Sequence, residues 1–504
     1  MELLNYLLMG FSVALQPVNL FYCFIGVVIG TLVGVLPGLG PVAAMSLLLP
    51  ATFHTTPVAS IIMLSGIYYG AMYGGSTTSI LVNIPGEAAS VMTCIDGYQM
   101  ARNGRAGPAL GISAFGSFIA GTFGIFGLIL IAPPLVDFAL KFGPPEYFSL
   151  MVLGLMILTF LTSASMIRAL MMAAFGLVVG TMGLDNISGL ARFTFNIPEL
   201  LDGVGLVPVV MGLFGISEVL LNIELKVKRE VFTAKVKGLL PTLEDWGKSI
   251  WSILRGTILG FLLGILPGGG AVIASFVSYA VEKRVSKHPE EFGKGAIEGV
   301  AAPEAANNSA AQGAFIPLLT LGIPSNVVMA MLLGALIIHG VTPGPLLLSQ
   351  HPELFWGVVA SMYVGNALLL ALNLPLIGMW VQLLRVPYSI LFPIIILFCL
   401  LGSYSINNST TDVAIMLVFG VIGYLMKKIS LEAAPMVLAF VLGPMMETAL
   451  RQALIKSKGS FSIFFTRPIS ATCLIIAIAL IIMPLLPWFR QRRPGVKLEH
   501  EDVT

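Results

Sequence analysis

Apolar runs separated by short polar loops fill almost the whole chain. Two stretches, Leu3 to Gly86 and Ala305 to Pro352, contain no Asp, Glu, Lys or Arg. A spanning helix needs about 20 apolar residues, so each stretch is long enough to cross or enter a bilayer more than once. The runs centre near residues 27, 70, 120, 155, 173, 212, 258, 277, 325, 365, 395, 418, 440 and 478. Several are short or interrupted by Gly and Pro. The pattern therefore predicts an all-α polytopic membrane protein with roughly 10–14 membrane segments, some of them broken or re-entrant helical hairpins.

Two of the apolar runs end in the same interrupted sequence, GVLPGLG (Gly34–Gly40) and GILPGGG (Gly264–Gly270). The fifteen residues that end at Gly40 and at Gly270 share eight identities, among them glycines spaced four apart. A second pair follows the two copies, NIPGE (Asn83–Glu87) and GIPSN (Gly322–Asn326). The chain is thus predicted to contain two related halves, which we expect to be inverted repeats. The expected boundaries are a membrane half over residues 1–222, a polar basic connection over 223–249, a second membrane half over 250–487 and a polar tail over 488–504.

The two repeated motifs suggest different roles for their glycines. Glycines at i, i+4 and i+8 lie on one face of a helix and let a second helix approach closely. The Pro-Gly-x-Gly that follows stops the helix, because proline lacks the backbone donor and glycine admits conformations that other residues avoid. Freed backbone groups inside a bilayer must face protein or a water-filled cavity. Paired breaks of this kind indicate a transporter's binding site near the membrane midplane. The alternative is a re-entrant loop that only turns the chain.

Polar, uncharged residues cluster beside both breaks, and these are the predicted substrate-binding residues. Hydroxyl and amide groups can hold a carboxylate, whereas the alternative role of single Ser and Thr residues is to join helices. Buried acids are costly in a membrane, so acids at the clusters are candidates for ion coupling, although each could instead cap a helix. The predicted substrate-binding residues are Gly38, Gly40, Ser76, Thr77, Thr78, Asn83, Pro85, Gly268, Gly270, Asn307, Asn308, Ser309, Pro324, Ser325 and Asn326. The ion-coupling candidates are Glu87, Glu304, Gly269 and Gly322, with Na⁺ expected at broken-helix carbonyls. Asp96 is a further acid in an apolar context.

Basic residues mark the loops that we expect on the cytoplasmic side, because Lys and Arg are in excess there. These loops contain Arg102 and Arg105, Lys226–Lys237, Glu282–Lys294 and the tail Arg490–Arg493. A further basic stretch, Arg451 to Arg467, is separated from that tail by a single apolar run. The stretch from Arg451 to Arg467 and the tail cannot both be cytoplasmic if this run spans the membrane once, and we place the tail in the cytoplasm.

Composition excludes several classes of protein. The chain is 57% hydrophobic and 10% charged, whereas a soluble protein carries about a quarter charged residues. Its net charge of +2 gives no reason to expect nucleic-acid binding, and its four cysteines have no metal-ligand spacing. No Walker A, H-E-x-x-H or G-x-S-x-G motif occurs. We therefore expect no cofactor and no enzymatic activity, with transport driven by an ion gradient. A passive organic-anion channel and a membrane-embedded enzyme are the alternatives.

Long motifs around both breaks, such as GVLPGLGPVAAMSLLLP, YYGAMYGGSTTSILVNIPGEAAS and GVAAPEAANNSAAQGAFIPLLTLGIPSN, resemble the large membrane subunit of the tripartite tricarboxylate transporters, the TctA family. The resemblance implies a secondary transporter of the bacterial inner membrane that moves citrate-like di- or tricarboxylates by symport with Na⁺ or H⁺. It also implies two partners, a small membrane subunit (TctB-like) and a periplasmic solute-binding protein (TctC-like). By analogy with other carboxylate transporters, an elevator mechanism is expected. The family's paired motifs map onto Leu36–Gly40, Ile84–Gly86, Leu266–Gly270 and Ile323–Ser325. The particular carboxylate, the ion and the oligomeric state stay open.

Overall fold

The fold is almost entirely helical, as the hydrophobic pattern predicts. The computed structural model describes residues 2–36, 40–161, 165–185, 187–224, 238–268, 270–383 and 388–483. Within these ranges, ten helical segments are long and apolar enough to span a membrane, so the prediction of an all-α polytopic membrane protein is confirmed.

Nine of the ten spans are single helices, and the tenth is formed by three consecutive helical segments. The single helices are α2 (Pro17–Val35), α4 (Pro57–Val82), α6 (Ala106–Ala139), α7 (Pro144–Leu161), α11 (Leu243–Ile265), α17 (Pro352–Asn373), α19 (Tyr388–Asn407), α20 (Thr410–Lys428) and α21 (Ala433–Lys456). The composite span runs through α9 (Leu206–Val210), the π-helical segment η4 (Met211–Ile216) and α10 (Ser217–Glu224).

Shorter helices and one small hairpin complete the described part of the chain. The elements before residue 250 are α1 (Glu2–Ala14), α3 (Gly40–Leu48), η1 (Pro50–His54), η2 (Ala88–Ser90), α5 (Val91–Arg102), α8 (Met166–Gly180), the antiparallel strands β1 (Gly183–Leu184) and β2 (Ala191–Arg192), and η3 (Pro198–Leu200). Those after it are α12 (Gly270–Val285), η5 (Pro289–Glu291), α13 (Glu298–Gly313), α14 (Phe315–Leu321), α15 (Val327–Ile338), α16 (Leu347–Gln350), α18 (Ile377–Leu383), α22 (Ile463–Thr466) and α23 (Pro468–Ile482).

Two helices, α4 and α13, are buried along almost their whole length. Every residue of α4 from Ala59 to Val82 is buried, and so is every residue of α13 from Gly299 to Gly313. Their sequences are rich in Gly, Ala and Ser, and such small residues let neighbouring helices pack closely in a membrane. α2 packs along α4, and α11 packs along α13. The two polar clusters therefore lie on central helices.

The phased glycines lie where these pairs of helices touch. A β-carbon at Gly26, Gly30 or Gly34 of α2 would stand 2.2–2.5 Å from a backbone carbonyl oxygen of α4. In the second pair, a β-carbon at Gly260 of α11 would stand 2.2 Å from the carbonyl oxygen of Ala306 in α13. β-Carbons at Gly256 and Gly264 would stand almost as close to the carbonyl oxygens of Ala302 and Ala310, one turn before and one turn after Ala306. Real β-carbons do not approach so closely, so only glycine permits these contacts. The predicted close approach of helices at both glycine triplets is confirmed.

Both Pro-Gly motifs interrupt a helix, as predicted. α2 ends at Val35 and α3 begins at Gly40, while α11 ends at Ile265 and α12 begins at Gly270. Three glycines at the breaks have positive φ: Gly40 (59°), Gly268 (77°) and Gly270 (51°). That region of backbone space is open mainly to glycine. Pro37, Gly38, Leu39 and Gly269 lie outside the described residues.

The two Ile-Pro loops have matching backbones. α4 and α14 each end on a residue with positive φ, Asn83 at 59° and Gly322 at 71°. Four residues later, Glu87 and Asn326 are both extended and both cap the next helix. The Glu87 carboxylate accepts from the amide of Ala89 at 2.7 Å, and the Asn326 side chain accepts from that of Met329 at 3.0 Å. This likeness supports two related halves, while the exact boundaries and the inverted orientation stay predictions.

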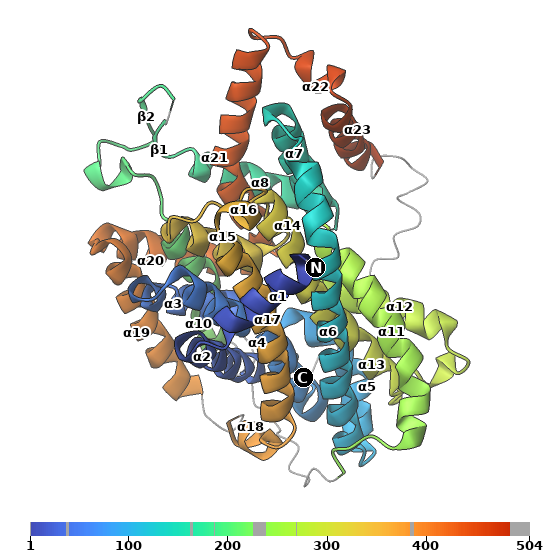
Figure 1. Cartoon of the computed structure of the whole chain (residues 1–504). Helices are drawn as coiled ribbons and strands as arrows, with labels where there is room; N and C mark the ends of the chain where they lie inside the picture. The colour runs from blue at the N-terminus through green and yellow to red at the C-terminus, as the bar shows by residue number, and fades with distance from the viewer. Residues whose placement is uncertain are drawn as a thin grey trace.

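Charged loops gather at two separate ends of the molecule. At one end, Arg105 forms an ion pair with Asp245, and the Asn103 amide donates to the carbonyl of Lys294. Near the other end, Arg467 pairs with Glu146. Figure 1 shows α22 and the β1–β2 hairpin at the top of the view and α5 at the bottom. The basic stretch from 451 to 467 therefore lies away from the loops predicted to be cytoplasmic. The segments Lys226–Lys237 and Arg490–Arg493 lie outside the described residues.

This separation predicts the outcome of cysteine labelling. Lys287 and Ser460 are both exposed, one in each group of loops. In spheroplasts, a membrane-impermeant maleimide should label a Ser460→Cys variant, and it should label a Lys287→Cys variant only after lysis, because we place the Glu282–Lys294 loop in the cytoplasm and the stretch from 451 to 467 on the opposite side. The parent protein, with three buried cysteines and the half-buried Cys94, is the labelling control. Equal labelling of both variants in intact spheroplasts would contradict the arrangement.

Candidate functional site

Polar residues of the two central helices meet around one buried carboxyl group. The Ser76 hydroxyl of α4 donates to Oε2 of Glu304 in α13 at 2.5 Å, although the two residues lie 228 positions apart. The Thr93 hydroxyl of α5 donates to Oε1 of the same group, and the Asn307 amide lies 3.3 Å from Oε2. All four side chains are buried. The structure thus brings the two predicted polar clusters into direct contact.

A chain of amide and hydroxyl groups extends from this carboxyl group along α13. Nδ2 of Asn308 lies 2.6 Å from Oδ1 of Asn307 and 2.8 Å from Oγ of Ser117 in α6. Asn307 and Asn308 are therefore held by buried polar partners on both sides. Because an unpaired buried polar group costs about 1–3 kcal/mol, these contacts fix the orientation of both amides.

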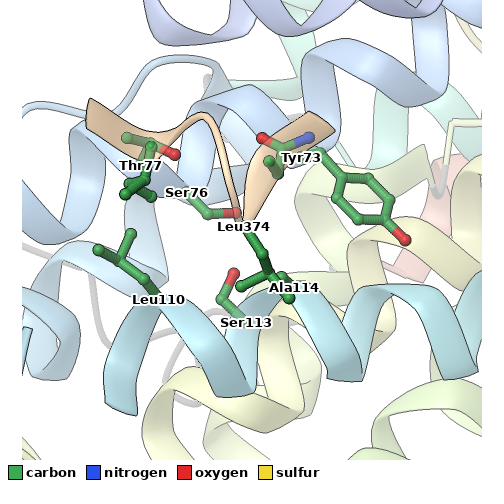
Figure 2. A pocket seen from close by; sticks show the side chains of 9 residues that line it. Tyr73, Ser76, Thr77, Leu110, Ser113, Ala114 and Leu374 are labelled. Atoms are coloured by element: carbon green, nitrogen blue, oxygen red, sulfur yellow. The ribbon is translucent and has the colours of Figure 1, made fainter. Parts of the chain in front are cut away.

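A small pocket opens next to the carboxyl group, between α4, α6 and the end of α17 (Figure 2). Its enclosed space is about 10 Å³, room for about one water molecule, whereas typical ligand sites measure roughly 300–1,000 Å³. Figure 2 shows the hydroxyls of Ser76 and Ser113 turned toward the same space. Oδ1 of Asn373 is buried here and has no hydrogen-bond partner among the described residues. The lining residues are Tyr73, Ser76, Thr77, Leu110, Ser113, Ala114, Asn373, Leu374 and Ile377.

Three of the predicted site residues use their hydroxyls to join helices. Thr78 donates to the carbonyl of Val35 at the end of α2, at 2.7 Å. Ser309 donates to the carbonyl of Thr257 in α11 at 2.8 Å, and Ser325 lies 3.5 Å from the carbonyl of Ala314. For these residues the structure shows the helix-joining role that the sequence left open as the alternative.

The second break and the second Ile-Pro loop contact each other. The amide of Gly268 donates to the carbonyl of Ser325 at 2.7 Å, and the Asn326 amide group lies 3.4 Å from the Tyr68 hydroxyl of α4. These contacts link the loops of the second half to a central helix of the first. The other predicted residues around the breaks differ in exposure: Asn83 is exposed, Pro85, Gly40 and Gly270 are half-buried, and Pro324 and Gly322 are buried.

The interrupted segments of the two halves pack crosswise. α12, which follows the second break, contacts η2, which follows the first Ile-Pro loop. In the same way α3, which follows the first break, contacts α15, which follows the second Ile-Pro loop. Each break therefore leads into a helix that touches the other half. Gly38 and Gly269 lie outside the described residues, so their own contacts stay predictions.

The two remaining acids of the sequence analysis have different surroundings. Glu87 is buried beside Gly75 of α4, and its Oε1 has no hydrogen-bond partner in the described part of the chain. Asp96 instead accepts from the backbone amides of Gly293, Gly295 and Ala296 at 2.8–2.9 Å and from the Tyr279 hydroxyl at 2.8 Å. Asp96 therefore fastens α5 to the loop before α13. Among the residues that the structure describes, no three or more His, Cys, Asp or Glu side chains form a group that could hold a metal ion.

Several residues of this region do not stand out in the sequence. Thr93, Ser113, Ser117 and Asn373 are isolated polar residues on α5, α6 and α17. They do not adjoin a repeated motif, and a single Ser or Thr in an apolar run is common in membrane helices. Only the packing of their helices against α4 and α13 brings them to the site.

Comparisons with known proteins agree with the resemblance seen in the motifs. Residues 20–438 match the family model described as "Tripartite tricarboxylate transporter TctA family". The chain is similar to a protein of Agrobacterium vitis described as "Uncharacterized 52.8 kDa protein in TAR-I ttuC' 3'region", with 53% identity over 501 residues, covering 99% of this chain and 100% of the relative. It is also similar to an "Uncharacterized protein in TAR-II ttuC' 3'region" of the same organism, with 54% identity over 242 residues, covering 48% of this chain and 100% of that relative. No solved structure matches the chain.

Proposed function

This chain belongs to the tripartite tricarboxylate transporter TctA family, and from that premise we propose that it is the subunit that moves di- or tricarboxylates across the bacterial inner membrane by symport with Na⁺ or H⁺. The multi-pass helical fold and the family make it a membrane transporter subunit. The ion coupling, the solute class and the membrane are the parts that we propose. A small membrane subunit and a periplasmic solute-binding protein would complete the assembly.

One observation carries the proposal: a buried polar junction joins the central helices of the two halves. Ser76 and Thr77 of α4 line the pocket, and the Ser76 hydroxyl also donates a hydrogen bond to Glu304 of α13. Hydroxyl and amide donors can hold a carboxylate without an opposing buried charge. A buried acid beside them can bind the cation that compensates the solute. The pocket-lining hydroxyls and the Glu304 carboxyl group lie where the two halves meet. A movement of α4 relative to α13 would therefore change the surroundings of the solute site and of the acid at the same time.

The pocket is small, which supports a mechanism that includes movement. Its enclosed space of about 10 Å³ has room for about one water molecule, so a citrate-sized solute needs a wider arrangement of the surrounding helices. The crosswise contacts of α12 with η2 and of α3 with α15 are the contacts that such a movement would change. We propose the elevator type of movement by analogy with other carboxylate transporters.

Reconstitution tests the proposal directly. The subunit, its small membrane partner and the solute-binding protein would be placed in proteoliposomes, and uptake of labelled citrate, malate and succinate would be measured. We expect accumulation of at least one of them above the external concentration, and only with an inward Na⁺ or H⁺ gradient. Uptake that equilibrates but never accumulates would indicate the passive channel, and uptake unchanged after collapse of every ion gradient would reject coupling. Release of a chemically altered product would indicate the enzyme.

A further inference from the structure

Glu304 is a buried acid without a basic partner, as Glu87 also is within the described part of the chain. Glu304 is fully buried in α13, and its hydrogen-bond partners are the hydroxyls of Ser76 and Thr93 and the amide of Asn307. No Lys, Arg or His forms an ion pair with it within the described part of the chain. A fully buried carboxylate without a cation is strongly unfavourable, because desolvation of the charge is not repaid.

Other buried acids show what compensation looks like in this fold. Glu282 pairs with Arg255, Asp245 with Arg105 and Glu146 with Arg467. Asp96 has no basic partner, but three backbone amides and a tyrosine hydroxyl satisfy it. Glu304 has no basic partner, and its hydrogen-bond donors are two hydroxyls and one side-chain amide, all of them neutral. Neutral donors do not cancel the charge, so a proton or a cation from outside the chain would compensate it.

The neighbours of Glu304 favour a proton over a metal cation. Sodium in transporters is typically coordinated by carbonyls of unwound helices. The hydrogen-bond partners of Glu304 are instead side chains on helices α4, α5 and α13. Hydroxyl groups both donate and accept, so they can pass a proton along a chain. Ser76 donates to Glu304 and also lines the pocket, which connects the carboxyl group to a polar space.

We propose that Glu304 is the proton-binding group of the transport cycle, and that Ser76 passes the proton between the pocket and its carboxyl group. A hydronium ion in the pocket becomes water as its proton forms an O–H bond on the Glu304 carboxylate, which becomes a neutral carboxylic acid. An anionic solute can then occupy the pocket without facing a second negative charge. The inference deepens the proposed function and rests on it, because it chooses the ion and names its site.

Three titratable side chains lie close enough to affect Glu304. They are Tyr73 of α4, Cys94 of α5 and Glu87 before η2, each of which interacts electrostatically with it. Glu87 is the competing proton site, because its Oε1 is buried and has no hydrogen-bond partner among the described residues. The test therefore includes glutamine substitutions at both acids.

Infrared difference spectroscopy tests proton binding on the subunit in lipid, without any solute. Changing the pH should alter a band of a protonated carboxyl group in the wild type. The band should vanish in Glu304→Gln, persist in Glu87→Gln and in the exposed control Glu353→Gln, and be insensitive to Na⁺. A band lost only in Glu87→Gln, or displaced by Na⁺ at constant pH, would overturn the assignment.

Transport by the full complex in proteoliposomes gives a second readout. With an inward proton gradient, Glu304→Gln should reduce citrate accumulation to no more than the external concentration, while exchange of internal for external solute continues, because glutamine mimics the protonated acid. Glu304→Asp should restore part of the accumulation. If Na⁺ alone drove accumulation in the wild type, the proton would not be the coupling ion, but ion-driven transport would still hold. If no carboxylate were taken up under any gradient, the proposed function itself would be refuted. Loss of exchange together with an unchanged carboxyl band would assign Glu304 a structural role.

Discussion

Replacing Gly260 with leucine is expected to prevent recovery of a folded protein. A β-carbon at this position would lie 2.2 Å from the carbonyl oxygen and 2.6 Å from the α-carbon of Ala306 in α13. Both are backbone atoms of a fully buried helix, so relief requires the whole of α11 or α13 to shift. Overpacking by single methylene groups already costs about 1–3 kcal/mol. The measurement is size-exclusion chromatography of the detergent-solubilised protein after a heating series.

Gly247 provides the matched control on the same helix. It is exposed, and no atom lies within 4 Å of a β-carbon built there. Replacing glycine with leucine raises the helix propensity equally at both positions, by about 0.8 kcal/mol. Gly247→Leu should therefore elute and melt like the wild type, while Gly260→Leu should aggregate. Equal behaviour of the two variants would show that the close approach of α11 and α13 is unnecessary.

Removal of the polar groups at Thr77 or Asn308 is expected to abolish transport while leaving the protein inserted. Thr77→Val keeps the shape of the side chain but removes a hydroxyl from the lining of the pocket. Asn308→Leu removes the amide that contacts Ser117 and Asn307. In the proposed function these groups donate to a carboxylate of the solute. A hydrogen bond to such a charged group contributes about 1.5–3 kcal/mol, so its loss should lower uptake by about tenfold or more.

The controls for this experiment separate loss of function from loss of folding. Thr159→Val removes a hydroxyl that is also buried, but that one donates to the carbonyl of Met156 within its own helix, α7. This variant should transport normally. All variants would be quantified in the membrane and by size-exclusion chromatography before uptake is measured. Normal transport by both Thr77→Val and Asn308→Leu would show that the pocket and its amide chain are not the solute site.

The helices, their breaks and the close packing beside them could be predicted because each has a local signature. Apolar length predicts a span, and glycines four apart predict a contact face whichever helix covers it. Pro-Gly-x-Gly stops a helix in any surroundings, as Gly268 and Gly270 show with their positive φ. The likeness of NIPGE and GIPSN extends to the helix caps at Glu87 and Asn326, because capping depends on residues next to each other in sequence.

The roles of individual polar residues could not be predicted in the same way. Thr77 and Thr78 are neighbours with identical side chains, yet one lines the pocket and the other donates to Val35. Adjacent residues on a helix point in directions about 100° apart, and the helix packed on each side decides what each one meets. Asp96 looked like Glu304 as an acid in an apolar context. Only the folded loop around Gly293 shows that it is fully satisfied by the protein.

The sequence by itself therefore determined that this protein is a multi-pass helical membrane protein with two repeated helix breaks, since apolar length, glycine phasing and proline act over a few residues. Only the tertiary structure decided that Ser76 and Thr93 donate to Glu304, that Asp96 links α5 to the loop before α13, and that α12 and α3 each contact the opposite half. Those facts depend on elements that meet although about 180 or more residues of chain separate them. The packing of small residues between helices decides which elements meet, and it leaves no local sequence pattern that identifies the partner.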